Sequence, residues 1–226
     1  MRIHYAISLL IPLLLLSCEH TSYDTGDGAY SHMQTDYVTV TVHDDYVQSI
    51  VTDEGRSLAY SKGMTYDVEP VDTTLRWLLY YNDNGNDPIE IVGRNTMWLL
   101  KPKERYEIAM MKTDPVTVTG VWVAKNGKYL NLRLGLKTGK TDDSQARHTV
   151  SLIKEGVSDD VVYYTLYHDQ ADIPQYYTQE YFFTVEVTEQ REIDLTINTY
   201  NGVWHKQFII HNSQFTISSK VESSPT

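Results

Sequence analysis

The stretch that decides the fold is Tyr129-Leu130-Asn131-Leu132-Arg133-Leu134-Gly135-Leu136-Lys137. Leucines occupy every second position, and mostly polar or small residues fill the positions between them. Because side chains alternate between the two faces of a strand, this period of two predicts a β-strand with one face in an apolar core. No stretch of the chain shows a sustained apolar period of 3.6 residues. The sequence therefore predicts an all-β protein.

Similar short strands are predicted on both sides of this stretch. They cover residues 37–42, 49–52, 57–60, 76–81, 89–93 and 95–100 before it, and residues 116–119, 121–123, 148–153, 161–167, 181–187, 193–199, 206–210 and 215–221 around and after it. Turn signals separate several of them: residues 53–56, with Gly55, and the Asn-Gly pairs at 84–85, 126–127 and 201–202. Asn-Gly favours a tight hairpin because both residues tolerate positive φ.

The alternation breaks around residues 101–115. Lys101-Pro102 could open a short helical turn, and Asp114-Pro115 marks a boundary. The strands before the break suit a small barrel, and the more numerous strands after it suit a β-sandwich. We predict a barrel domain at residues 36–112, a sandwich domain at 113–221 and a polar tail at 222–226.

The chain begins with an apolar leader. Residues 5–16 are apolar except for Ser8 and Pro12, and a small residue, Ser17, then precedes Cys18, the only cysteine. A membrane-spanning helix needs about 20 apolar residues, so this segment is too short. It is typical of a bacterial lipoprotein signal at 1–17, cut before Cys18, whose sulfur then carries lipid; palmitate is one such acyl group. The alternative is a cysteine that follows a secretory signal by chance.

Several acyl chains hold a protein firmly to a membrane. The sequence therefore predicts lipidation at Cys18, a polar tether at 18–35 and a place in the cell envelope. Glu19 follows the cysteine in place of the Asp that marks retention at the inner membrane in many diderm bacteria, and this resemblance favours the outer membrane.

Charge and composition exclude some partners. The net charge is −11, and it becomes −12 once the leader and its single basic residue, Arg2, are removed. Such an acidic surface repels phosphate backbones, so we predict no nucleic-acid partner. The chain has 18 Tyr against 4 Phe, which indicates either strand propensity or a tyrosine-lined recognition face.

No motif predicts catalysis, a metal or a cofactor. His168 and Asp169 are adjacent, and neighbours on a strand point to opposite faces, so a catalytic pair is not expected. We expect His168, Asp169 and Gln170 to cap a loop through backbone hydrogen bonds. Residues 135–141 are not a phosphate loop, because three residues separate the glycines where four are required. The histidines lack metal-ligand spacing.

Instead, a binding surface is predicted on the loops between residues 168 and 181. Its candidate members are His168, Asp169, Gln170, Tyr176, Tyr177 and Tyr181.

Several segments resemble NigD-like lipoproteins. They are residues 26–31, 51–58, 129–132, 166–170, 176–177 and 197–202, together with the leader. The resemblance implies an N-terminal OB-like barrel and a C-terminal β-sandwich. It also implies a suspected bacteriocin-immunity role, and no catalytic residues.

We therefore expect a non-enzymatic, membrane-tethered protein that binds a peptide or protein outside the cytosol. A glycan-binding accessory of an uptake system, using tyrosines between 163 and 181, is the alternative. A third possibility is an envelope structural subunit that pairs strand to strand at a sheet edge.

Overall fold

The computed structural model describes residues 33–66, 73–83, 85, 88–142, 145–187 and 192–210. Within these ranges the chain is built from strands, with one 3₁₀ turn, η2 (Arg105–Glu107), and no α-helix. The all-β prediction is confirmed. The predicted signal at 1–17, Cys18, the predicted strand at 215–221 and the tail at 222–226 lie outside the described residues, as does most of the predicted tether.

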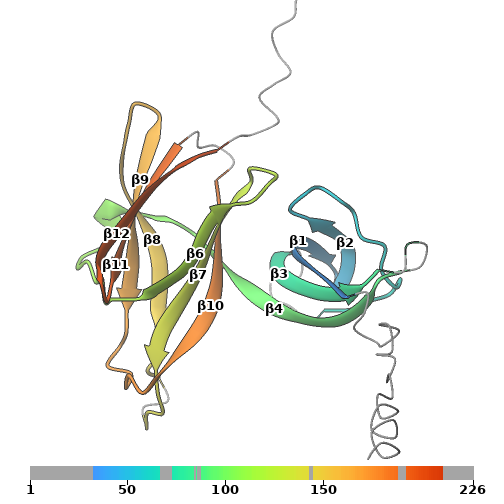
Figure 1. The fold of residues 1–226 in the computed structure, drawn as a ribbon, viewed down its shortest axis with the longest axis horizontal. Helices are drawn as coiled ribbons and strands as arrows, with labels where there is room; N and C mark the ends of the chain where they lie inside the picture. The colour runs from blue at the N-terminus through green and yellow to red at the C-terminus, as the bar shows by residue number, and fades with distance from the viewer. Residues whose placement is uncertain are drawn as a thin grey trace, which may run out of the picture. The chain divides into compact units, whose positions relative to one another are not determined.

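The described strands form two sheets (Figure 1). Sheet A has the order β2 (Tyr46–Thr52), β1 (Met33–His43), β3 (Thr73–Asn82), β4 (Glu90–Leu100), β10 (Tyr177–Glu186), β7 (Tyr129–Thr138) and β6 (Thr117–Val123). Sheet B has the order β12 (Gly202–Ile209), β11 (Glu192–Thr199), β9 (Val161–Asp169), β8 (Thr149–Ser158) and β5 (Lys103–Glu104).

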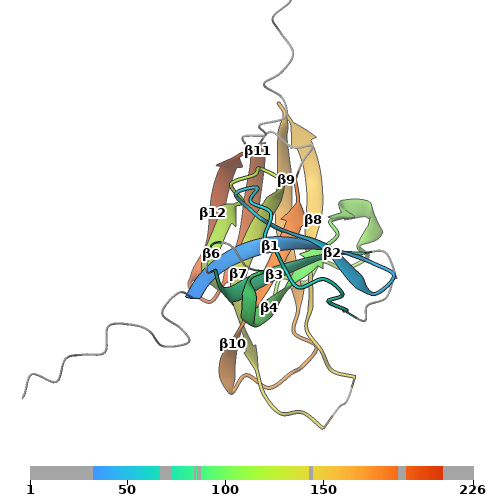
Figure 2. The ribbon, with the colours of Figure 1, turned by 90° about the vertical axis from the view of Figure 1, so that its right-hand side faces the viewer.

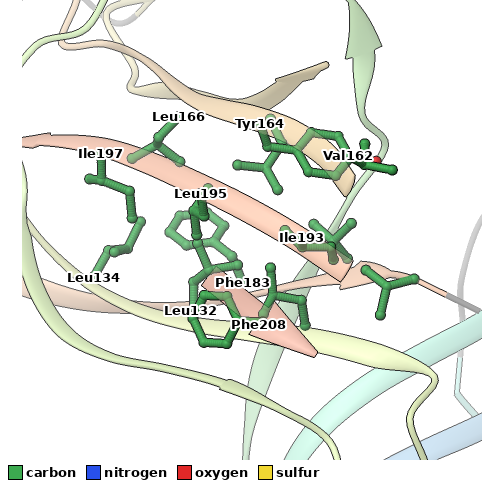
Figure 3. Packing of buried hydrophobic residues seen from close by; sticks show 14 of the residues in the cluster. Leu132, Leu134, Val162, Tyr164, Leu166, Phe183, Ile193, Leu195, Ile197 and Phe208 are labelled. Carbon is green, nitrogen blue, oxygen red and sulfur yellow. The ribbon is translucent and has the colours of Figure 1, made fainter. Parts of the chain in front are cut away.

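The main core lies between sheet B and the β6, β7 and β10 end of sheet A. The alternating leucines of β7 are all buried, as the sequence predicts. Figure 3 shows Leu132, Leu134 and Phe183 of sheet A against Val162, Tyr164, Leu166, Ile193, Leu195, Ile197 and Phe208 of sheet B. The period of two on both sheets produces this sandwich, because each strand presents one apolar face.

A second core belongs to the strands near the N-terminus. Alternating valines of β1 pack with apolar residues of β2 and β3: Val38, Val40, Val42, Val47, Ile50, Trp77, Leu79 and Tyr81. These strands do not close into a barrel within the described residues, because β4 pairs with β10 of the sandwich while β2 stays at the edge of sheet A. The β-sandwich part of the fold prediction is confirmed, whereas the predicted small barrel is an open, curved extension of sheet A. The predicted boundary between residues 112 and 113 stays a prediction.

Local predictions were right for most strands and wrong for a few. Residues 89–93 and 95–100 form one strand, β4, and residues 116–119 and 121–123 form one strand, β6, with a register shift. Residues 57–60 form no strand; only Ser57 makes a bridge, to Val51. Gly55, Gly127 and Gly202 have φ of 88°, 68° and 105°, as their predicted turns require.

A buried polar network lies where β4 and β10 pair. The Arg76 side chain is fully buried and donates to both carboxylate oxygens of Asp53, at 2.6 and 2.9 Å. Its guanidinium also lies 4.1 Å from the centre of the Tyr129 ring. Asn131 of β7 joins the network and accepts a 2.8 Å bond from Thr184 of β10. Side chains from distant parts of the chain therefore fix this part of sheet A.

Candidate functional site

His168, the first predicted site residue, is completely buried at the end of β9. Its Nδ1 lies 2.9 Å from the backbone oxygen of Asp114, so Nδ1 carries the hydrogen. Its Nε2 therefore accepts from Nδ1 of His148, 3.0 Å away. Burial lowers the pKa of both imidazoles, and the mutual repulsion of the two rings lowers that of His148 further. His168 is a structural residue, and its side chain does not reach a binding surface.

Asp169 and Gln170 fix the turn after β9. Asp169 accepts from the backbone of Ala171 at 2.9 Å, and Gln170 donates to the backbone oxygen of Ile173 at 2.7 Å. Ala171 and Asp172 have φ of 51° and 58°, and these side-chain bonds stabilise that left-handed turn. Backbone capping by His168, Asp169 and Gln170 matches the prediction.

This turn borders a polar hollow of about 630 Å³. Lys112 and Asp169 form a 2.7 Å ion pair on its wall, and their hydrogen bond raises the pKa of Lys112 and lowers that of Asp169. The carboxylate of Asp114 accepts from the backbone of Gln170 at 2.8 Å. The charged groups named here are therefore occupied in holding the turn.

The predicted tyrosines are not among the residues that line this hollow. Tyr176 and Tyr177 are 77% and 59% exposed. Tyr181 is partly buried and stacks on Phe183, with 6.3 Å between ring centroids. The structure thus divides the six predicted residues: His168 in the interior, Asp169 and Gln170 at the hollow, and the tyrosines along β10 and the segment before it. A binding role for the exposed members stays a prediction.

Tyr181 lies at a different feature, an opening between β4 and β10. These two strands are parallel and pair only from Met97 with Phe182 to Leu100 with Val185. Towards their N-terminal ends, β4 stays beside β3 and β10 stays beside β7. In Figure 1 β4 bends away from β10, and Figure 2 shows β10 running on past β4. We call this opening, between residues 91–96 and 177–181, the β4–β10 fork.

The fork contains a hollow of about 510 Å³. Its lining residues come from four strands of sheet A and are Tyr80, Asn95, Thr96, Trp98, Arg133, Glu180, Tyr181 and Phe182. Trp98 is 57% exposed, which is unusual for a large aromatic residue in the middle of a sheet. An exposed Trp in a concave site is a frequent feature of binding surfaces.

The two faces of the fork differ in chemistry. Trp98 is paired with Phe183 and so shares its face with Tyr181, which makes this face aromatic. On the opposite face Arg133 bonds Glu180 through Nε at 3.1 Å and lies over the Phe182 ring at 5.5 Å. The hydrogen bond that Arg133 donates to Glu180 raises the pKa of Arg133, so the guanidinium stays charged.

The fork also exposes strand edges. Among the described residues, backbone pairing of 91–96 with β10 and of 177–181 with β4 is absent. Every second residue of each strand therefore points its N–H and C=O groups into the opening. The described residues contain no cluster of His, Cys, Asp and Glu suited to a metal. Aromatic rings, one ion pair and free backbone groups suit binding of a polypeptide.

Sequence reasoning missed Trp98, Arg133 and Glu180. The alternation around Arg133 did show that this side chain leaves the core. Nothing local shows that β4 and β10 become neighbours and then separate, since this depends on pairing between distant segments.

Comparison with known proteins identifies the C-terminal domain. Residues 99–205 match the model of the NigD-like C-terminal beta sandwich domain. The chain therefore carries a β-sandwich domain of the NigD-like type over these residues. The match covers β5 to β11 and part of β12, which form most of the sandwich described above. No curated protein matches this chain.

Solved structures share the fold. A NigD-like immunity protein from Bacteroides caccae has a TM-score of 0.59 and 20% identity, over 78% of this chain and 96% of its own. A candidate lipoprotein from Bacteroides fragilis has a TM-score of 0.58 and 12% identity, over 80% of this chain and 99% of its own. At these identities the likeness establishes the fold alone. Among the described residues, no helix is long and apolar enough to span a membrane.

Proposed function

We propose that this protein is a non-enzymatic lipoprotein of the cell envelope that captures a peptide outside the cytosol. The observation that carries this proposal is the β4–β10 fork, a concave site with an exposed Trp98 and unpaired strand edges. Aromatic anchors in a hollow supply most of the energy of many protein interfaces.

Two further observations support the proposed location in the cell envelope and the proposed capture of a peptide. The leader ending at Cys18 is typical of lipoproteins, and a fold relative from Bacteroides fragilis is a candidate lipoprotein. Another fold relative is a NigD-like immunity protein, which favours an immunity-like capture of a bacteriocin peptide. Lipid on Cys18 would then hold the protein at the outer membrane.

The net charge of −11 indicates which peptides would be attracted. An acidic protein steers cationic peptides over a distance that salt shortens to about 8 Å at physiological ionic strength. We therefore test binding of a basic peptide that kills a deletion strain, at low and at high salt. Tighter binding at low salt and protection by the restored gene are expected. Equal binding at both salt concentrations would contradict this proposal.

A glycan-binding role is the second candidate. On the outer face of sheet B, Tyr163 is 39% exposed and lines a hollow of about 370 Å³ with Asp194 and Thr196. A flat ring beside polar groups can stack on a sugar. If the protein binds glycans at this hollow, a glycan array should give hits that the Tyr163→Ala variant loses. An array without hits would contradict glycan binding.

A further inference from the structure

We propose that the β4–β10 fork admits one extended peptide strand, inserted between β4 and β10 and antiparallel to both. This inference rests on the peptide capture proposed above and specifies how the peptide is held. Binding of a strand to an exposed sheet edge obtains affinity from main-chain hydrogen bonds and specificity from alternate side chains.

Both edges of the fork are suited to such a strand. Strand β4 extends back from Met97 to Glu90, and β10 extends back from Phe182 to Tyr177, with their facing edges unpaired in the described structure. Residues 177–180 and 94–96 are exposed. Strands in a sheet lie about 4.8 Å apart, so one strand fits where the two have separated to about twice that spacing. The hollow of about 510 Å³ lies where they separate.

The pairing pattern of sheet A favours an antiparallel guest. The pairs β1–β2, β3–β4, β7–β10 and β6–β7 are antiparallel, whereas β4 and β10 are parallel to each other. A strand that runs opposite to both parallel strands continues the alternation across the sheet. Antiparallel pairing is also slightly more stable per residue than parallel pairing.

The two faces of the fork specify the side chains of the guest. Guest residues on one face meet Trp98 and Tyr181, which are aromatic, and those on the other face meet Asn95 and the Arg133–Glu180 pair. The preferred peptide therefore alternates apolar and polar residues. The acidic protein as a whole favours lysine or arginine among the polar ones.

The experiment selects peptides from a random octapeptide library with the soluble mature chain carrying Cys18→Ser. Each selected peptide is remade twice, with N-methyl groups on the odd or on the even residues. In a strand held on both sides, one set of N–H groups faces β4 and the other faces β10. Either modification should therefore weaken binding at least tenfold. Amide exchange at residues 91–96 and 177–181 should slow when the unmodified peptide binds.

A matched pair of variants locates the site. Trp98→Ala should weaken binding at least tenfold, whereas Tyr106→Ala, which removes an aromatic side chain 86% exposed on η2, should leave it unchanged within twofold.

Other outcomes overturn the inference in distinguishable ways. If only one of the two N-methylated peptides binds more weakly, the peptide adds to a single strand edge. If neither binds more weakly, the protein recognises side chains alone. In both cases the proposed peptide capture stands, and the insertion between two strands is wrong. If the chain forms a dimer in solution and the same amides are protected from exchange without peptide, the fork binds a second copy of this chain and the inference is wrong. A library that yields no peptide overturns the proposed function together with this inference.

Discussion

Arg76 is a fully buried charged residue in the N-terminal part of sheet A. Its side chain has no exposed area, and Asp53 is its charged partner at 2.6 Å. A buried ion pair is costly to desolvate, and its members depend on each other far more strongly than those of an exposed pair. Thr39 and Asn131 accept further bonds from Arg76, so the charge is satisfied from several strands.

We expect Arg76→Leu to lower the free energy of unfolding by about 3–5 kcal/mol, because Asp53 is left charged and buried. The double variant Arg76→Leu with Asp53→Leu should be more stable than Arg76→Leu alone, since no unpaired charge remains. Denaturant unfolding of the wild-type protein, the single variant and the double variant measures these free energies. Arg105→Leu is the control, with an expected loss below about 1 kcal/mol, because its contact with Glu155 is exposed and 3.7 Å long. A double variant less stable than the single one contradicts the argument.

The His148–His168 pair predicts a pH dependence of stability. Burial holds both pKa values below the ordinary 6.5, so the unfolded chain binds protons more readily than the folded one. Stability is then fully present above about pH 6.5 and declines as the pH falls through 6.5 towards the folded pKa values. The midpoint of urea unfolding, followed between pH 7.5 and 5, should fall.

The control for this dependence is His168→Asn, in which the decline below pH 6.5 should become shallower. His43, which is exposed, is the comparison position, and His43→Asn should leave the decline unchanged. An equally steep decline in all three proteins would assign it to other groups.

At the scale of elements, β7 is packed closely on both sides because Gly135 lies at its centre. A Cβ at Gly135 would approach Cγ2 of Thr178 on β10 to 2.7 Å and Cβ of Thr117 on β6 to 3.2 Å. Thr is stiff at χ1, so the neighbouring strands would have to shift. The absence of a side chain at Gly135 therefore sets how closely β6, β7 and β10 pack.

We predict that Gly135→Ala lowers the unfolding free energy by about 1–3 kcal/mol through overpacking. Adding Thr178→Ser, which removes the nearer methyl group, should recover part of the loss. Gly156→Ala on β8 is the matched control, because nothing lies within 4 Å of its added Cβ. Thermal unfolding of the four proteins tests the prediction, and a neutral Gly135→Ala would refute it.

At the scale of the whole molecule, two cores share one sheet. The sandwich core and the core of β1–β3 are joined through β4, which pairs with β3 on one side and with β10 on the other. The Arg76 network adds buried bonds between β3 and β7 and between β10 and β7. Strand pairing in sheet A is therefore continuous from one core to the other.

We therefore expect residues 36–210 to unfold in one cooperative transition. Calorimetry should give a single peak whose calorimetric and van't Hoff enthalpies agree. Two resolved transitions would show instead that β1–β4 unfold independently, as the predicted boundary between residues 112 and 113 implies.

The sequence by itself determined the strand content and the identity of the core faces. The leucines of β7 and the valines of β1 are buried as predicted, because the period of two is a local property that the pleat of any strand imposes. The turns at Gly55, Gly127 and Gly202 could also be predicted from the sequence, since positive φ favours glycine. The lipidation predicted at Cys18 also rests on a local pattern, namely the apolar leader and the small residue Ser17 that precede it.

Only the tertiary structure decided which strands became neighbours. The parallel pairing of β4 with β10 leaves sheet A open where a barrel was expected, and it creates the fork, whose hollow Trp98 lines. The contact of His148 with His168 and the burial of Arg76 also depend on segments far apart in the chain. Hydrophobic burial specifies that a strand must cover its apolar face, but not which distant strand its edge will meet.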